Sequence, residues 1–307
     1  MKRRELASCR VLIAMENPII RQGLQNALNS QGYPRASEVT ALDRLIATLV
    51  DSTFDVILTS TELGNDSVAP FLAQLRHGAL VHHPVPIVVA FLTSAENSYV
   101  RQVIDSGPDD LMQMPIVPGQ LITRLDILSK QRKSFVVTSD YVGPDRRQAQ
   151  RPGAMVVPTL DVPNPLAMRL ARKSDDEIKE AAAAAAERLL AMRLARFTFE
   201  LQWLLRAIRG LFEQKSGDRE KFHSFCERIK TLLQSLPRVV PGGLPETIAS
   251  LAERLDTGTN ILIKNGLSAD STVIQGVTKL VFNLVRALRE QLPADLAKTT
   301  DLISASS

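Results

Sequence analysis

The sequence predicts an α/β domain built on a parallel sheet, then a basic linker that contains prolines, then an all-α helical bundle. Three observations carry this prediction. Short apolar runs alternate with helix-type spacing up to residue 130, and a stretch with five prolines and no helical periodicity follows. From residue 174 the chain has a helix start, an alanine-rich run and then apolar stripes at steps of three and four from residue 190. Alternating strand and helix patterns indicate a sheet wrapped by helices, whereas such stripes indicate amphipathic helices. We therefore expect three segments, 1–130, 131–173 and 174–307.

Apolar runs in the first segment predict buried strands, and helix-type spacing fills the intervals between them. Asn17-Pro18 is typical of a helix start, and Gly32 is typical of a helix end. The whole alternation fits five strands in a flavodoxin-like doubly wound parallel sheet, whose ligand sites lie beyond the carboxyl ends of the strands. The runs at which we expect strands include residues 10–14, 55–59, 86–91 and 111–114.

The second segment, 131–173, is predicted to be a linker because its prolines interrupt regular helices and sheet pairing. It is basic: residues 130–173 hold nine Lys and Arg against three Asp, a net charge of +6 in a chain whose formal charge is +4. An exposed basic strip attracts phosphates and other anions. Within it, residues 134–138 have the composition of an edge strand, and residues 141–145 have that of an anchored turn.

The third segment, 174–307, is predicted to be a helical bundle. Ser174 and Glu177 form a capping box, and the alanine-rich run that follows has the highest helix propensity. Four amphipathic helices with short connections indicate an antiparallel bundle, within one chain or shared between two. The four apolar stripes begin at Leu190, Phe222, Ile248 and Val273.

The composition is that of an ordinary globular protein, 45% hydrophobic and 23% charged over 307 residues. The longest apolar runs are far shorter than the roughly 20 residues that a membrane helix needs, and the basic N-terminus lacks the apolar core of a signal peptide. We therefore expect a cytoplasmic protein. Cys9 and Cys226 lack the spacing of a disulfide framework or a zinc site. We expect neither a metal nor a cofactor.

Three stretches near the expected carboxyl ends of strands carry a family resemblance: residues 11–18, 54–63 and 107–115. In element order, spacing and a glycine-to-proline signature, residues 8–130 resemble the receiver domains of response regulators in two-component signalling. The resemblance implies a phosphoryl-accepting site. In that site two acids and an aspartate hold magnesium, the aspartate attacks the phosphorus, and a Thr or Ser together with a Lys binds the phosphoryl oxygens.

The residues at these positions depart from the family's pattern. Met15 supplies no hard oxygen for magnesium. Ser60, at the nucleophile position, carries a hydroxyl that stays protonated without a base beside it. Met114 stands at the lysine position and leaves the phosphoryl charge without a fixed cation. The sequence therefore predicts a degenerate phosphoacceptor pocket, formed by Met15, Glu16, Ser60, Glu62, Thr93 and Met114.

Two details of this pocket stay open at this point. The hydroxyl position falls at Leu92 or Thr93, depending on a shift of one residue. Glu62 lies two residues beyond Ser60 and can face the same pocket as Glu16, so residual cation binding by two carboxylates is an alternative to an inert pocket.

Two other patterns suggest different functions. Arg147 and Arg151 match the RxxxR half of the motif with which PilZ domains bind cyclic di-GMP, and with Arg146 they form a candidate anion site. The second half of that motif, DxSxxG, is absent downstream. His223, on the second predicted bundle helix, is a candidate for histidine phosphotransfer, but the Lys and Gly that usually follow such a histidine are missing. An ordinary surface histidine is the competing interpretation.

These observations together predict a non-enzymatic signalling adaptor. It would be a pseudo-receiver that binds protein partners without phosphorylation, joined to a helical module for homodimerisation or partner binding. We expect no sequence-specific DNA binding, because neither a helix-turn-helix nor a basic zipper region follows the receiver. Binding of cyclic di-GMP or a polyanion by the linker, and histidine phosphotransfer by the bundle, are the alternatives.

Overall fold

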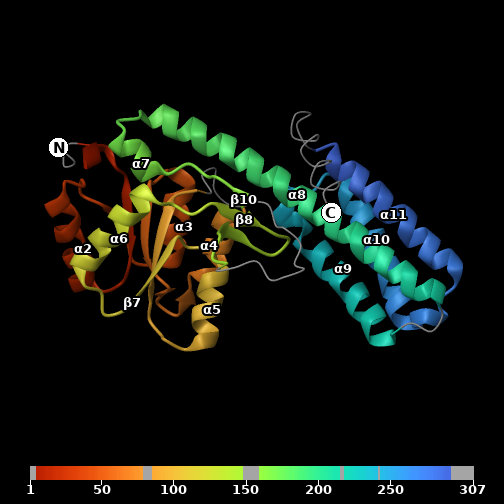
Figure 1. The fold of residues 1–307 in the computed structure, drawn as a ribbon. Helices are drawn as coiled ribbons and strands as arrows, with labels where there is room; N and C mark the ends of the chain where they lie inside the picture. Colours follow the sequence, from red (N-terminus) through yellow and green to blue (C-terminus); the bar gives the residue numbers. More distant parts are fainter. Residues whose placement is uncertain (1–4, 79–84, 148–158, 215–217, 241–242, 292–307) are drawn as a thin grey trace. The chain divides into compact units, whose positions relative to one another are not determined.

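The structure, a computed structural model, describes residues 5–78, 85–147, 159–214, 218–240 and 243–291. Contacts divide the chain into two units, Met1–Glu187 and Arg188–Ser307. Figure 1 shows the sheet of the first unit and the helices of the second. The long helix α8, Asp175–Gln214, contributes residues to both units.

Five parallel strands form the centre of the first unit, in the order β2-β1-β3-β6-β7, which confirms the flavodoxin-like doubly wound sheet. Along β1, Val11 and Ile13 belong to one apolar cluster and Leu12 and Ala14 to another, so both faces of the sheet are covered. The edge strand β2 is mostly exposed, and for that reason no apolar run marks it in the sequence. The strands are β1 Val11–Ala14, β2 Ser37–Val39, β3 Val56–Ser60, β6 Ile87–Leu92 and β7 Asp110–Gln113.

Helices on the two faces of this sheet begin and end where local chemistry stabilises them. The Asn17 side chain accepts the backbone N–H groups of Ile19 and Ile20, and Gly32 ends the same helix with a φ of 92°. One apolar cluster lies under α2 and α6, and the other under α3 and α4 (Figure 1). The helices are α2 Pro18–Gln31, α3 Leu42–Asp51, α4 Ala69–Arg76, α5 Asn97–Asp105 and α6 Pro118–Lys130.

The segment predicted to be a linker is folded onto the first unit in its described residues. Three short antiparallel strands form a second sheet in the order β10-β8-β9, and the helix α7 follows. The predicted edge strand corresponds to β8, and the predicted turn lies at β9. The elements are β8 Phe135–Val137, β9 Val142–Pro144, β10 Thr159–Leu160 and α7 Pro165–Leu170.

A buried ionic cluster attaches this second sheet to the amino-terminal edge of the parallel sheet. The carboxylate of Asp109, directly before β7, lies 2.7 Å from Arg76 and 2.8 Å from Arg132. Arg132 also donates to the carbonyl oxygens of Val85 and Pro86, just before β6. Both guanidinium groups lie over the ring of Phe135 in β8. Arg132 is thus a structural cation and not part of a solvated basic strip.

A second buried ion pair attaches α7. Arg169 donates to the carboxylate of Asp55 at 2.8 Å, and both side chains are 4% exposed. Asp55 directly precedes β3 and also accepts the backbone N–H of Arg10. Arg169 reaches Asp175, the first residue of α8, at 2.5 Å. The linker expectation therefore differs from the structure, because Arg132 and Arg169 pair with acids that are distant in the sequence.

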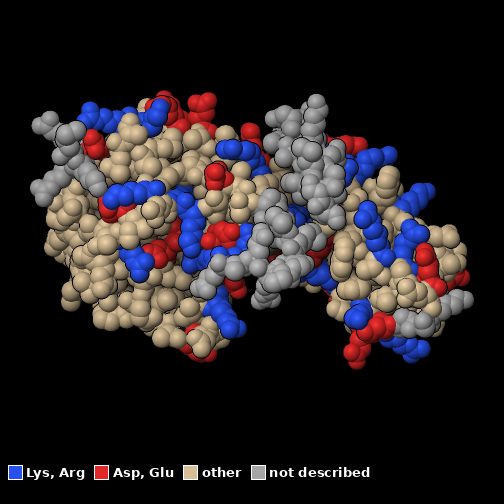
Figure 2. Space-filling model, in the orientation of Figure 1, with Lys and Arg blue, Asp and Glu red and all other residues tan. Residues whose placement is uncertain are grey.

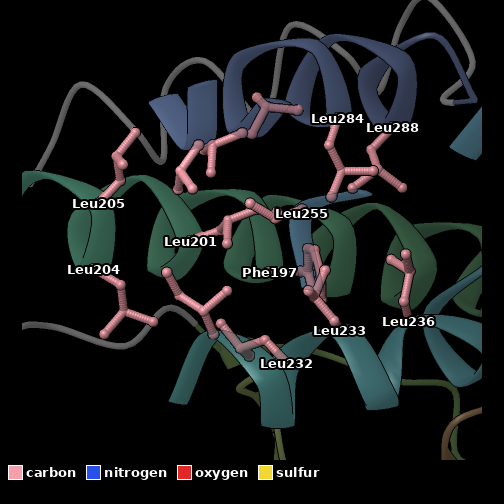
Figure 3. Packing of buried hydrophobic residues seen from close by; sticks show 14 of the residues in the cluster. Phe197, Leu201, Leu204, Leu205, Leu232, Leu233, Leu236, Leu255, Leu284 and Leu288 are labelled. Carbon is pink, nitrogen blue, oxygen red and sulfur yellow. The ribbon is translucent and has the colours of Figure 1, made fainter. Parts of the chain in front are cut away.

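Four α-helices build the described part of the second unit and confirm the predicted helical region. Their apolar faces meet in one core to which all four contribute, as Figure 3 shows for Phe197, Leu233, Leu255 and Leu284. Helices α10 and α11 approach closely at Gly258, where an added Cβ would lie 2.9 Å from a methyl group of Val277. After α8 the helices are α9 Arg219–Val239, α10 Glu246–Asn265 and α11 Ser271–Arg289. None of the described helices could span a membrane.

Candidate functional site

The degenerate pocket lies at the carboxyl ends of four parallel strands. Met15 follows β1, Ser60 ends β3, Thr93 follows β6 and Met114 follows β7. Because parallel strands end at one edge of their sheet, these four positions converge there. The expected residues are thus brought together at the carboxyl-terminal edge of the sheet.

Both methionines are part of the apolar core. Met15 is 2% exposed and belongs to the same cluster as Ile13 and Phe91, and Met114 is half-buried against that cluster. The thioether is adaptable and apolar, so it fills the space that a carboxylate and an ammonium group would otherwise need to keep polar. These two positions therefore supply packing and neither a magnesium ligand nor a phosphate-binding cation.

Ser60 is buried at the end of β3, with an exposure of 5%. Its hydroxyl oxygen accepts the backbone N–H of Glu62 at 3.4 Å. A serine hydroxyl becomes a useful nucleophile only when a base removes its proton. Within the described residues no base forms a hydrogen bond with this hydroxyl. The hydroxyl instead helps to fix the turn into the β4–β5 hairpin, Glu62–Leu63 and Asp66–Ser67.

A hydrogen-bond network holds the polar side of the pocket. The Thr93 hydroxyl donates to the Glu62 carboxylate at 3.0 Å and lies 2.9 Å from the Tyr99 hydroxyl. Tyr99 donates to the Thr61 hydroxyl at 2.6 Å, and Thr61 donates to the carbonyl oxygen of Phe91. The network links the end of β3, the end of β6 and the start of α5.

The same network places Thr93 and not Leu92 in the pocket. Leu92 is buried with Ala90 and Val103 in a small apolar cluster under α5, whereas Thr93 follows the strand and turns its hydroxyl toward Glu62. Thr61 and Tyr99 were not among the predicted site residues. Their hydroxyls lie near a carboxylate only because the strand ends converge, and no local pattern marks that contact.

The other acid of the pocket, Glu16, is exposed after β1. One of its carboxylate oxygens would lie 3.5 Å from a Cβ added at Gly64, so it faces the turn of the β4–β5 hairpin. Arg21 donates to the carbonyl oxygens of Met15 and Glu16 and pairs with Glu38 at 3.0 Å, which fixes this loop. Within the described residues no three His, Cys, Asp or Glu side chains gather as they would around a metal ion.

The candidate anion site of the linker is placed only in part. Arg146 donates to the carbonyl oxygen of Pro108 at 2.6 Å, and Arg147 pairs with Asp145 at 2.7 Å. The hydrogen bond from Arg147 lowers the pKa of Asp145 to about 2. Arg151 lies outside the described residues. Figure 2 shows basic and acidic side chains scattered in small groups over the face in view, and not in one continuous basic strip.

His223, the candidate for phosphotransfer, is exposed on α9, between buried Phe222 and half-buried Phe225. Its placement at the surface is what an ordinary surface histidine would show. Solvent exposure is equally compatible with a phosphotransfer histidine, so the histidine stays a prediction of the alternative function.

Comparison with known proteins finds a family model and solved structures that each match part of the chain. A search of curated proteins returned no match. Solved structures that resemble the chain include an orphan response regulator of H. pylori. The sequence identity is 17% and the TM-score is 0.33, and the match covers 39% of this chain and 95% of that chain. Another is a CheY-like receiver domain protein of Methanospirillum hungatei, with 16% identity, 38% and 90% covered and a TM-score of 0.35.

A third similar structure is a response regulator of Burkholderia pseudomallei with a phosphorylated aspartic acid, a calcium ion and citrate. It is 20% identical, covers 38% of this chain and 65% of that chain, and has a TM-score of 0.34. The family model of the response regulator receiver domain matches residues 11–126, and the helical region of the second unit lies outside this match. Residues 11–126 of the chain therefore belong to the response regulator receiver domains.

Proposed function

We propose that this receiver domain acts without accepting a phosphoryl group, as the docking part of a non-enzymatic adaptor in two-component signalling. The observation that carries the proposal is the state of the pocket. Ser60 stands where the family's aspartate would be, and Met15 and Met114 pack into the core. The protein would signal through protein partners, with the helical second unit as a further binding or dimerisation module.

Each replaced residue removes one requirement of phosphoryl transfer. Attack on phosphorus needs a standing carboxylate, and a neutral hydroxyl at Ser60 does not supply it. Magnesium prefers oxygen ligands in octahedral geometry, and Met15 offers none. The transferred group carries negative charge, which Met114 leaves without a cation. Restoring one of these groups would leave the other two requirements unmet.

The remaining polar groups of the pocket favour a single fixed conformation. Thr93, Glu62, Tyr99 and Thr61 are bonded to one another rather than left open for a ligand. A network of this kind holds the loops after β3 and β6 without an incoming phosphate. The network therefore supports a receiver surface that stays in one signalling state. Regulation would then come from the presence or absence of the protein partner.

Hydrogen exchange with a phosphoryl mimic tests this proposal. Beryllofluoride with magnesium binds the carboxylate of a phosphorylatable receiver, and a receiver of that kind serves as the positive control in the same buffer. We expect the amides of residues 58–64 and 91–99 of this chain to exchange at unchanged rates. Added protection in either stretch, at beryllofluoride concentrations that saturate the control, would contradict a permanently fixed pocket.

A further inference from the structure

A cavity of about 540 Å³ opens on the second unit between α8 and α11. This volume is within the range of sites that hold ligands or the anchor side chains of partners, roughly 300–1,000 Å³. Ile274, which is 7% exposed, belongs to the lining and connects it to the bundle core. The cavity is remote in sequence from the receiver pocket, and nothing in the receiver family match extends to it.

Each wall of the cavity presents a phenylalanine and a cation that are three residues apart. On α8 these are Arg209 and Phe212, and on α11 they are Lys279 and Phe282. Residues three apart on a helix lie on the same side of it. Phe282 is 66% exposed, more than Trp203 at 46% or Ile261 at 40%, the other large apolar side chains exposed among the described residues of this unit. An exposed aromatic at the edge of an apolar cavity is typical of a binding surface and unusual on a free one.

The charge at the rim is positive. Glu213, the acid of the lining, is already engaged by Arg209 at 3.4 Å on the same helix. Within the described residues Lys279 forms no ion pair, and it lies about one turn from Phe282. The sequence of the unit agrees with this sign, because residues 188–307 contain seventeen Lys and Arg against twelve Asp and Glu, a net charge of +5.

Because the rim of the cavity is positive and its inner surface is apolar, we infer that the cavity between α8 and α11 binds an acidic amphipathic helix of a partner protein. The helix would insert an apolar side chain between Phe212 and Phe282, and its carboxylates would face Lys279. Amphipathic helices commonly dock in apolar grooves in this way, through anchors at helical spacing. The inference rests on the proposed adaptor function and names the chemistry of its partner.

Two other occupants fit the observations less well. A second copy of the chain would bring the same positive rim to the cavity, and like charges across an interface disfavour the contact. A membrane surface is flat, whereas the site is a cavity with a buried floor at Ile274. The experiment below distinguishes binding of a second copy or of a membrane from binding of a helical peptide.

The probe is a synthetic acetylated 16-residue peptide of Glu and Leu with one central Phe, apolar at the spacing i, i+3, i+4 and i+7, carrying a fluorescent label. A twin with Lys in place of Glu is the charge control. Anisotropy titration of the full chain should give saturable one-to-one binding of the acidic peptide and much weaker binding of the twin. Phe282→Ala and Lys279→Glu should each weaken binding about tenfold or more, and added salt should reduce the effect of Lys279→Glu.

The chain offers matched control residues on α10, where Ile261 and Lys264 are also exposed and three residues apart. Ile261→Ala and Lys264→Glu should leave the affinity for the acidic peptide nearly unchanged. Because Phe282 and Lys279 are exposed, their variants should keep the helical content and thermal midpoint of the wild type, and circular dichroism checks this.

Several results would overturn the inference. They are the absence of saturable binding, equal binding of the twin, wild-type affinity in Phe282→Ala or Lys279→Glu, or an equal loss in the α10 controls. Binding to anionic vesicles in place of the peptide, or a dimer that Phe282→Ala dissociates, would assign the cavity to a membrane or to a second copy. None of these results bears on whether the receiver accepts a phosphoryl group, so the adaptor proposal would stand or fall separately.

Discussion

At the residue scale, the side chains of the receiver pocket occupy the same positions as those of the family, but they differ from them in chemistry. Met15 and Met114 occupy the space of charged groups and join the core. Thr93 keeps a hydroxyl at the end of β6, yet this hydroxyl is bonded to Glu62 and Tyr99. The hydroxyl at the position that binds phosphoryl oxygens in the family is thus hydrogen-bonded within the protein here.

The Thr93 hydroxyl should contribute measurably to the stability of the first unit. Thr93→Val removes the bonds to Glu62 and Tyr99, and each such bond contributes on the order of 1 kcal/mol. Thr93→Ser keeps the hydroxyl and serves as the control. Hydrogen exchange of β6 amides under denaturant reports the unfolding free energy of this unit. A Val variant as stable as the wild type, or a Ser variant as destabilised as Val, would show that the network is not stabilising.

At the scale of the elements, buried ion pairs attach segments beyond residue 130 to the receiver sheet. The second sheet and α7 are attached through Asp109 with Arg76 and Arg132, and through Asp55 with Arg169. Asp55 and Ser60 stand at opposite ends of β3, so the strand that ends in the degenerate pocket begins at the attachment of α7 and α8. We therefore propose that the functional receiver unit extends well beyond residue 130.

Asp109→Asn should destabilise the first unit strongly, by about 3–5 kcal/mol, because it leaves two buried guanidinium groups without their carboxylate. The neighbouring Asp110 is the matched control. Its pair with Arg124 spans 3.6 Å, and Arg124 is 53% exposed, so Asp110→Asn should cost at most about 1 kcal/mol. The measurement is hydrogen exchange in β6 and β7. Similar effects of the two variants would contradict the role of the buried cluster.

The same carboxylate predicts a pH dependence. Burial by itself raises the pKa of Asp109, but Arg132 and Arg76 outweigh burial and hold the pKa below its ordinary value. A carboxylate with a lowered pKa stabilises the fold above its unfolded pKa of about 4, and this stability is lost as the pH falls through the folded pKa. The difference in unfolding free energy between wild type and Asp109→Asn should therefore shrink as the pH falls below about 4. A difference that is constant with pH would contradict this assignment.

At the scale of the whole molecule, the sequence predicted what depends on local patterns. Periodicity located the parallel sheet and the four bundle helices, and strand ends located the pocket. The contacts that the sequence did not reveal join distant residues. Arg169 and Asp55 are 114 positions apart, and Tyr99 reaches Thr61 across 38 positions. The exposed β2 was not located for a different reason, because a strand without buried residues leaves no hydrophobic signal.

Homodimerisation through the helical unit is part of the adaptor proposal. Exposed apolar side chains such as Trp203, which stacks edge-on against Phe225 at 5.5 Å, offer contact area on this unit. Light scattering across a range of concentrations should show a mass of twice the 33.8 kDa of the chain. A monomer at every concentration would remove the dimer from the proposal and leave the binding of other partners.

The central claim is that the receiver does not accept a phosphoryl group, and intact-mass spectrometry after incubation with acetyl phosphate and magnesium tests it most directly. We expect no mass gain for the wild type or for Ser60→Asp alone, because Met15 and Met114 would still withhold a magnesium ligand and a phosphate-binding cation. Restoration should need at least Met15→Asp, Ser60→Asp and Met114→Lys together. A stoichiometric gain of one phosphoryl group on the wild-type receiver domain would contradict the account.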